Sequence, residues 1–311
     1  MCDTTKTEIE LIEQLKAERD AVILAHYYVD PAVQALADHV GDSFALAKLA
    51  ASLPNKTLVF CGVKFMGESA KLLSPDKTVL MPAPQADCPM AHMVTPERIA
   101  QMKETYDDLA IVTYVNSTAE IKSVSDVCVT SSNAIDIVRN LPQKNIFFNP
   151  DQNLGRFVAQ QVPEKNIILN PGCCPHHNSV QIEQVLELKE LYPDAEVLAH
   201  PECTAELLSH ADFIGSTKAM IEYAEQSSCT DFIVVTVQGI IYELEQRTKN
   251  TNKRFFFTKT PPRCPDMDMV TVQGIIDCLT DTTGAYEVHV SDDITQPACH
   301  ALQNMLDYAA R

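Results

Sequence analysis

The chain contains an internal repeat: five landmarks occur three times, in one order, about every 87 residues. Each unit begins with a short apolar run rich in strand-forming residues, at 21–28, 109–116 and 195–202. His26, Tyr114 and His200 hold matching positions in these runs, with offsets of 88 and 86 residues. Since self-similarity at a fixed period indicates repeated structural units, we expect three copies of one small domain.

Four further landmarks follow in each unit: a hydroxyl residue that opens a helical pattern, a second apolar run, a third run that starts at a lysine, and a cysteine. In this order they are Ser43, Ser131 and Ser216; residues 57–61, 145–149 and 232–236; residues 77–81, 165–169 and 253–257; and Cys88, Cys174 and Cys264. Apolar strands that alternate with helical stretches are typical of βαβ units, in which helices cover both faces of a parallel sheet. The sequence therefore predicts an α/β fold of three three-layer αβα domains related by a pseudo-threefold axis.

The expected domain boundaries follow the repeat, at 1–98, 99–184 and 185–311. Amphipathic helices are expected at 7–19 in the first domain and at 297–310 in the third, because apolar residues recur there at helical spacing. No Gly/Ser-rich or Pro-rich linker separates the units, and the chain has nine glycines. We therefore expect the domains to pack tightly, with any shared site at their common interface.

Charge argues against two classes of partner. The chain carries 24 Lys and Arg against 42 Asp and Glu, a formal net charge of -18, which repels nucleic acid and anionic membrane surfaces. The first residues lack the basic and apolar regions of a secretory signal, so a cytoplasmic location is expected. In that reducing compartment the eleven cysteines are expected to be packing residues, metal ligands or nucleophiles rather than disulfides.

Polar side chains end the first strand of every unit, where parallel α/β sheets bind ligands. Residues i and i+2 share one face of a strand, and the resulting pairs are His26 and Tyr28, Tyr114 and Asn116, and His200 and Glu202. The three helix-opening hydroxyls have two interpretations. Each can be a simple N-cap, whereas three helix N-termini that face one axis would form an anion site from N–H groups and hydroxyls.

The recurring cysteines also have two interpretations. A single cysteine is usually a small buried hydrophobe, and no Cys-x-x-Cys motif is present. The recurrence of Cys88, Cys174 and Cys264 instead favours three thiolates of a 4Fe-4S cluster, whose fourth iron is then free to act as a Lewis acid. The repeat alone does not separate Cys174 from Cys173. At least one of the two histidines that follow is expected to enter the site, and the remaining cysteines, Cys2, Cys61, Cys128, Cys203, Cys229, Cys278 and Cys299, are expected to pack or to lie on the surface.

These residues resemble those of the quinolinate synthase family over essentially the whole chain. The segments that carry the resemblance are 25–28, 41–43, 62–68, 113–117, 129–133, 150–155, 200–202, 215–217 and the three cysteines. The resemblance implies condensation of iminoaspartate with dihydroxyacetone phosphate on a 4Fe-4S cluster with one open iron, releasing phosphate and two waters, in NAD biosynthesis. It also implies the triplicated fold, and it names L-aspartate oxidase as the upstream enzyme without implying that the two proteins bind.

The family's roles transfer to matching positions of this chain. Cys88, Cys174 and Cys264 correspond to the cluster ligands, which selects Cys174 over Cys173. We expect Glu202 to be the main general base, with Tyr28 and His200 as proton donors or relays. The other substrate contacts are expected to be Ser43, Ser131, Ser216 and Thr217 for carboxylate or phosphate oxygens, His26 and His177 for carboxylates, and Tyr114 and Asn116 for the ring or its open-chain precursor.

One position departs from the family pattern. The family carries an acidic residue in a Thr-acidic-x-Gly run, and this chain has Val237 there. The valine lies outside the expected catalytic set, but it could weaken a domain contact or a hydrogen bond. The run at 235–241 also recurs identically at 270–276, out of phase with the repeat.

Three other functions remain open from the residues alone. The first is another cluster-dependent hydro-lyase acting on a hydroxy acid. The second is an iron–sulfur sensor, which would need a basic or partner-binding element that the sequence does not show. The third is a metal-free sugar-phosphate binder with its cysteines in the core.

Overall fold

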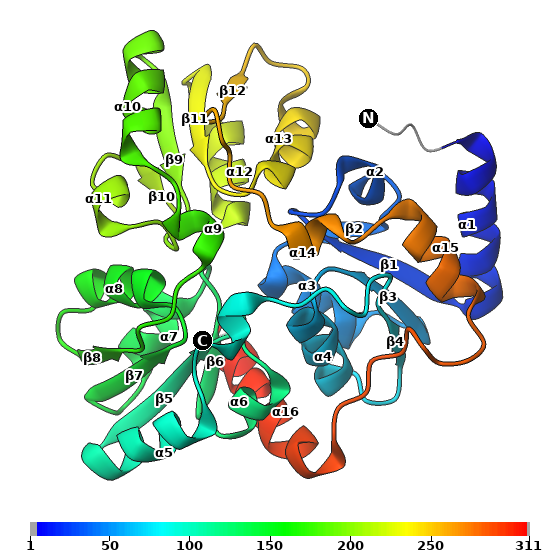
Figure 1. The fold of residues 1–311 in the computed structure, drawn as a ribbon, viewed down its shortest axis with the longest axis horizontal. Coiled ribbons are helices and arrows are strands. Elements are labelled where there is room, and N and C mark those ends of the chain that lie inside the picture. The colour runs from blue at the N-terminus through cyan, green and yellow to red at the C-terminus, as the bar shows by residue number, and fades with distance from the viewer. Residues whose placement is uncertain (1–4, 310–311) are drawn as a thin grey trace.

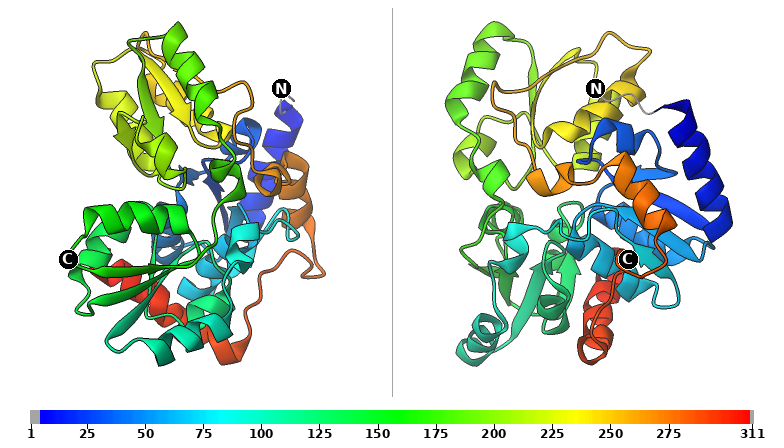
Figure 2. Two further views of the ribbon diagram at one scale, coloured as in Figure 1. Left: turned by 60° about the vertical axis from the view of Figure 1, so that its left-hand side comes forward. Right: turned by 45° about the vertical axis from the view of Figure 1, so that its right-hand side comes forward.

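The computed structural model describes residues 5–309, which fold around three separate parallel sheets of four strands each (Figure 1). The strand orders are β2-β1-β3-β4, β6-β5-β7-β8 and β10-β9-β11-β12, so all three sheets have one topology. Helices flank each sheet, and the units surround a common centre in every view (Figures 1 and 2). The predicted fold class, three αβα units with parallel sheets, is confirmed.

Equivalent elements follow one another in the same order in each unit. The first unit has α1 (Lys6–Arg19), β1 (Ala21–His26), α2 (Pro31–Gln34), β2 (His39–Gly41), α3 (Ser43–Ser52), β3 (Thr57–Cys61), α4 (Lys64–Leu73), β4 (Thr78–Leu80) and η1 (Pro89–His92). The second has α5 (Pro96–Thr105), β5 (Leu109–Tyr114), α6 (Ala119–Ser123), β6 (Val127–Val129), α7 (Ala134–Asn140), β7 (Asn145–Asn149), α8 (Gln152–Gln161), β8 (Asn166–Leu169) and α9 (Pro175–Asn178). The third has α10 (Ile182–Leu191), β9 (Glu196–Ala199), α11 (Ala205–Leu208), β10 (Phe213–Ile214), α12 (Thr217–Gln226), β11 (Asp231–Val235), η2 (Gln238–Ile240), α13 (Ile241–Thr248), β12 (Arg254–Phe256) and α14 (Pro265–Asp268).

The sequence pattern located three strands in each unit and missed the fourth. The missing strands are β2, β6 and β10, which have three, three and two residues. Runs this short are below the length at which apolar periodicity separates a strand from a loop. Each lies at a sheet edge and places the helix-opening hydroxyl that follows it beside the central strand.

Two polar contacts repeat with the units and explain part of the repeat. An aspartate just before each edge strand accepts a hydrogen bond from the backbone of the central strand, as in the pairs Asp38–Ile23, Asp126–Ile111 and Asp212–Val197, at 2.7–2.8 Å. The lysine that begins each third-strand run donates through Nζ to carbonyls at, or just beyond, the C-terminal end of a preceding helix; these lysines are Lys77, Lys165 and Lys253. Such carbonyls have no partner within their helix, so the lysine landmark is a helix-capping device.

The last two helices leave the third unit. The helix α15 (Val272–Thr280) packs against α1 and β3 of the first unit, and α16 (Asp292–Ala309) packs against α6, β6 and α4 of the second and first units. Figure 1 shows the orange and red segments crossing back in this way. The expected C-terminal helix is present but begins five residues earlier than predicted, and residue 310 of that prediction lies outside the described range. The boundaries 1–98, 99–184 and 185–311 stay a prediction, but these contacts tie the end of the chain to the first two units.

The duplicated heptapeptide adopts two different structures. Its first copy runs from the end of β11 through η2 into α13. Its second copy begins at Val270, two residues before α15, and continues through the first turns of that helix. Context therefore decides its conformation.

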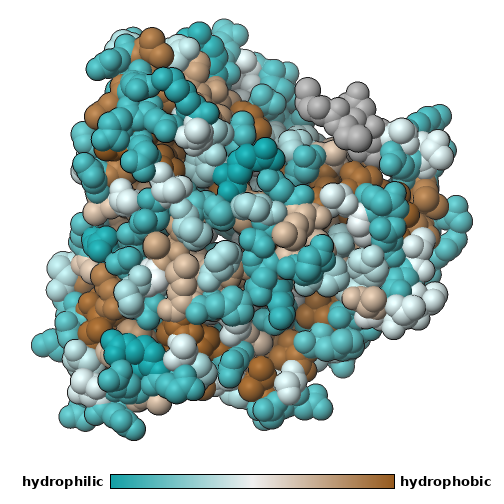
Figure 3. Space-filling view, viewed as in Figure 1, coloured by the Kyte–Doolittle hydropathy of each residue, from teal (hydrophilic) through white to brown (hydrophobic). Residues whose placement is uncertain are grey.

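Teal, hydrophilic side chains predominate on the face shown in Figure 3, as a net charge of -18 leads one to expect. Within the described part of the chain, no helix is long and apolar enough to cross a membrane.

Candidate active site

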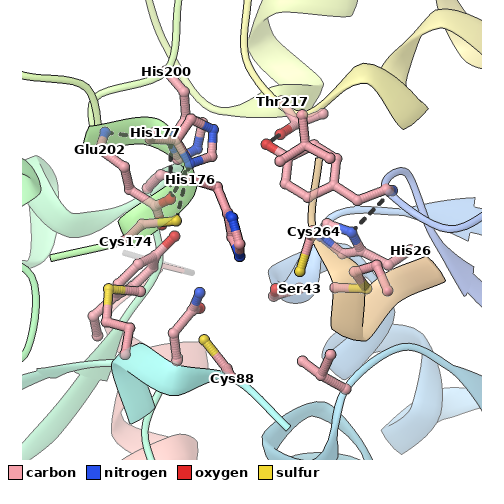
Figure 4. A pocket seen from close by; sticks show the side chains of 18 of the residues that line it. His26, Ser43, Cys88, Cys174, His176, His177, His200, Glu202, Thr217 and Cys264 are labelled. Atoms are coloured by element: carbon pink, nitrogen blue, oxygen red, sulfur yellow. Dashed lines mark hydrogen bonds and ion pairs between the residues drawn. The ribbon is translucent and has the colours of Figure 1, made fainter. Parts of the chain in front are cut away.

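One pocket lies where the three units meet, and it gathers side chains from all of them (Figure 4). The predicted site residues that line it are His26, Tyr28, Ser43, Cys88, Tyr114, Asn116, Ser131, Cys174, His177, His200, Glu202, Thr217 and Cys264. Ser216 is the one predicted residue that does not. The convergence follows from topology, because parallel strands and the helix N-termini that follow them meet at one edge of each sheet.

The central strands position the histidines. His26 is the last residue of β1, and His200 directly follows β9. In both units the Nδ1 atom accepts a backbone N–H bond from two residues later, from Tyr28 at 3.2 Å and from Glu202 at 3.3 Å. Accepting at Nδ1 leaves the proton on Nε2 in a neutral ring. Burial favours the same state, because it lowers the pKa of His26 to about 3 and that of His200 to about 4.

Glu202 is an almost fully buried carboxylate, 4% exposed. Its Oε2 lies 2.7 Å from His177 Nδ1, and it also bonds to the Tyr114 side chain. Burial opposes its ionisation, but the neighbouring His200 and His177 and the two hydrogen bonds outweigh burial and hold the pKa below its usual range. Glu202 is therefore a carboxylate at neutral pH and can accept a proton.

A chain of hydrogen bonds joins Tyr28 to this carboxylate. The Tyr28 hydroxyl lies 2.7 Å from both Thr217 Oγ1 and Thr236 Oγ1, and Thr236 Oγ1 lies 2.8 Å from His177 Nε2. His177 then reaches Glu202 through its other ring nitrogen. Burial raises the pKa of Tyr28, so the hydroxyl keeps its proton at neutral pH. The four-residue path crosses all three units and is suited to proton transfer.

The three pocket cysteines share one local structure. Each is the N-cap of a short helical turn whose first residue is proline, in η1, α9 and α14. Proline at this position costs no hydrogen bond and fixes the turn. Burial raises the pKa of Cys88 to about 12 and that of Cys264 to about 11, so both are thiols until a metal displaces the proton.

The three pocket sulfurs do not converge on one point. Among the described residues the only set compact enough to hold a single ion is Cys174, His177 and Glu202, so the three sulfurs do not lie together within one ion's coordination sphere. They nevertheless line the same pocket. Three thiols that surround a space without converging on one point fit a multi-iron cluster.

Comparison with known proteins shows the family of the chain. The model of the quinolinate synthetase A protein family matches residues 10–307 of the chain. This chain belongs to the quinolinate synthase family. It is 51% identical to the quinolinate synthase of Fusobacterium nucleatum over 298 residues, which cover 96% of this chain and 98% of that protein. It is 46% identical to that of Clostridioides difficile, with 94% and 95% covered, and 44% identical to that of Clostridium acetobutylicum, with 96% and 97% covered.

In this member of the quinolinate synthase family, the three helix-opening serines take different positions relative to the start of their helices. Ser216 is the N-cap of α12, and its Oγ accepts a bond from Ala219 N at 3.2 Å. Ser43 is the first residue of α3, which Asp42 caps, and Ser131 precedes α7, whose N-cap is Asn133. The simple capping interpretation therefore describes Ser216 alone, while Ser43 and Ser131 turn toward the pocket.

Sequence reasoning missed two buried side chains that support the site. Asp151 accepts bonds from the backbone N–H groups of Asn153 and Leu154 at 2.8 Å and of Cys174 at 3.0 Å, so it fixes the backbone of one pocket cysteine. Thr236 links Tyr28 to His177. Thr236 follows β11 at a position that matches Asn149 in the second unit, but this match alone does not mark Thr236 as part of the site.

Several buried polar atoms of the pocket residues have no protein partner in the described structure. They are Asn116 Oδ1, Thr130 Oγ1 and His176 Nε2. Figure 4 shows the His176 ring extending into the middle of the pocket. Buried polar groups are normally hydrogen-bonded, so these atoms are ready to meet a polar ligand.

Val237 lies at the pocket wall and is 4% exposed. The contact between units beside it is made by Gln34, whose Nε2 donates to the carbonyls of Gly239 at 2.9 Å and of Tyr27 at 3.0 Å. This contact holds the first and third units together without an acidic side chain at 237. The effect of Val237 on stability or rate stays a prediction.

Proposed function

We propose that this enzyme condenses iminoaspartate with dihydroxyacetone phosphate to form quinolinate, phosphate and two waters, using a 4Fe-4S cluster, as a step of NAD biosynthesis. The observation that carries the proposal is the shared pocket. One cysteine from each unit opens into the same space as the Glu202 carboxylate and the Tyr28 hydroxyl. Family membership supplies the reaction, and the pocket contains the proton-transfer groups that it needs.

Cys88, Cys174 and Cys264 would hold the cluster, since they line one pocket and each is a free thiol at a helix N-terminus. When bound, a cluster with three protein thiolates supplies one iron that acts as a Lewis acid on a carboxylate or a leaving hydroxyl. Asp151 would keep Cys174 in place through its backbone N–H.

Glu202 would remove protons from carbon or nitrogen during ring formation, because it is a carboxylate at neutral pH and lies in the pocket. Tyr28 would deliver a proton to a leaving oxygen, and the path through Thr236 and His177 would return one to it from Glu202. His200 stacks on His177 with ring centroids 4.9 Å apart and would keep that ring oriented. It can also donate through Nε2.

Neutral donors would bind the anionic groups of the substrates. No Lys or Arg is among the side chains that line the pocket within the described chain. The Ser43, Ser131 and Thr217 hydroxyls, the N-termini of α3 and α12, and the His26 Nε2–H group are available for carboxylate or phosphate oxygens. Ser216 would contribute through its place at the start of α12, and Tyr114 and Asn116 would contact the ring or its open-chain precursor.

The proposal places the enzyme in the cytoplasm, where the ten described cysteines, all free, would stay reduced. Iminoaspartate would come from L-aspartate oxidase. Supply of iminoaspartate by L-aspartate oxidase does not require that this protein and the oxidase bind each other.

The test is to convert Glu202 to Gln and to assay quinolinate anaerobically with both substrates. Glu206→Gln, at an exposed position on α11, is the matched control. We expect Glu202→Gln to lower kcat by about 10²–10⁴ with an unchanged visible spectrum of the cluster, and the control to keep full turnover. Full turnover in Glu202→Gln with an intact cluster would reject the role of Glu202, and no quinolinate from the parental enzyme would reject the reaction.

A further inference from the structure

The side chains of Cys174, His177 and Glu202 form a compact group of three different metal-ligand types. Their ligand atoms all lie within 4.8 Å of one another, and all three residues are buried. His177 Nδ1 lies 2.7 Å from Glu202 Oε2 and 3.3 Å from Cys174 Sγ. Figure 4 shows the three converging on one side of the pocket.

One of these distances already matches a tetrahedral zinc site, and a second is shorter than such a site needs. Zinc binds sulfur at about 2.3 Å, imidazole nitrogen at about 2.0–2.1 Å and carboxylate oxygen at about 2.0–2.2 Å, which places neighbouring ligand atoms about 3.2–3.6 Å apart. The separation of His177 Nδ1 from Cys174 Sγ already has this value. A shift of the Glu202 carboxylate oxygen away from His177 Nδ1 by about 0.5–0.9 Å would open that 2.7 Å separation to the same range, and a water could take the fourth position.

Surrounding contacts orient the ligands as they do in metal sites. A ligating histidine usually bonds through its second nitrogen to a fixed partner, and His177 Nε2 bonds to Thr236 Oγ1 at 2.8 Å. The backbone of Cys174 is held by Asp151. Ion binding releases the Cys174 thiol proton to solvent, and the His177 proton moves from Nδ1 to Nε2, where it donates to Thr236.

We propose that, before the cluster is installed, Cys174, His177 and Glu202 bind a single divalent cation of the zinc type. The ion and the cluster both require Cys174, so each excludes the other, and the ion also occupies the general base. A zinc-loaded chain is therefore held inactive until the ion is removed. The mutual exclusion of ion and cluster rests on the proposed function, because it assumes that Cys174 is a cluster ligand. The ion site itself does not depend on the cluster.

The test uses cluster-free protein, prepared with a reductant and a chelator and then titrated with Co²⁺. One ion per chain is expected, with the thiolate-to-cobalt absorption of a site that contains one cysteine, and Zn²⁺ should displace it. Cys174→Ser and Glu202→Gln should each weaken binding at least about 10-fold, and Thr236→Val, which removes the outer partner of His177, by about 10–100-fold.

Cys88→Ser and Cys264→Ser are the matched controls, because each removes a proposed cluster ligand outside the ion site. Both should bind one Co²⁺ as the parental protein does. Loss of binding in both controls, or unchanged binding in Cys174→Ser, would overturn the proposal, as would the absence of stoichiometric binding in the parental protein.

Iron reconstitution separates this proposal from the proposed function. Protein preloaded with Zn²⁺ should gain no iron until a chelator is added. Iron uptake at the same rate with and without Zn²⁺ would reject the exclusion. A protein that binds the ion as described but forms no quinolinate after reconstitution would contradict the proposed function and leave the ion site standing.

Discussion

Gly239 is the point at which the third unit touches the backbone of Tyr28, the proposed proton donor. A Cβ atom at 239 would lie 2.7 Å from both the Tyr28 Cα and the Tyr28 carbonyl oxygen, and 2.8 Å from the carbonyl carbon. These are backbone atoms, so no side-chain rotation relieves the overlap. Gly239→Ala should therefore push the two chain segments apart.

The size of the effect follows from these distances. Ordinary contact begins at 3.4 Å, so the segments must separate by about 0.7 Å. The hydroxyl of Tyr28 is held at 2.7 Å by both Thr217 and Thr236, and a shift of that size would stretch those bonds toward the limit for a hydrogen bond. We expect a loss of about 1–3 kcal/mol in the free energy of unfolding and a fall of about 10–100-fold in kcat.

The assay combines anaerobic quinolinate formation with thermal unfolding. Gly284→Ala is the matched control, because Gly284 has φ +82° and nothing within 4 Å of its would-be Cβ. Backbone strain there should cost about 1 kcal/mol without changing kcat. A Gly239→Ala enzyme with the parental kcat and Tm would refute the reasoning that this close approach positions Tyr28.

Four further outcomes follow from the same structure. Tyr28→Phe should lower kcat by about 10²–10³ while Tm changes by only a few degrees, measured by steady-state assay and thermal unfolding. Asp151→Asn should lower the iron bound per chain and cost about 1–3 kcal/mol, because an amide cannot accept all three backbone N–H bonds. Lys253→Met should cost about 1–3 kcal/mol in urea unfolding and leave kcat unchanged, since it removes the cap on α12 and a cation–π contact with Phe232, both outside the pocket. His26 and His200 should each cost cluster-free protein about 2 kcal/mol of stability as the pH drops from 7 to 5, because their folded pKa values lie below the unfolded value of 6.5 and protonation favours the unfolded state. Burial raises the pKa of Asp151 to about 8, which opposes this trend, so the slope of stability against pH is compared with that of His26→Gln, and equal slopes would contradict the burial of His26 as a neutral ring.

Most of the site could be predicted because the repeat places equivalent strand ends at one centre. His26, Tyr114 and His200 are matched in the sequence and lie together in the pocket, although 88 and 86 residues separate them along the chain. A further signal was present in the sequence, since each pocket cysteine is followed by a proline that starts a helical turn. Cys173 lacks that proline, which independently selects Cys174.

The rest depended on contacts that a repeat does not encode. Thr236 has counterparts at Asn149 and Cys61, yet Asn149 bonds to Thr113 inside its own unit, so position alone did not mark Thr236 as part of the site. Asp151 acts through the backbone of a residue 23 positions later. The helices α15 and α16 lie beyond the third repeat, and only tertiary packing shows that they return to the first two units.

The central claim is that the three units join to hold an iron–sulfur cluster through Cys88, Cys174 and Cys264. The most direct measurement is anomalous diffraction at the iron edge from crystals of protein purified without oxygen. We predict one multi-iron peak in the pocket, bounded by these three sulfurs, and roughly four irons per chain in the same preparation. An empty pocket in active protein, or iron held by other cysteines, would contradict the account.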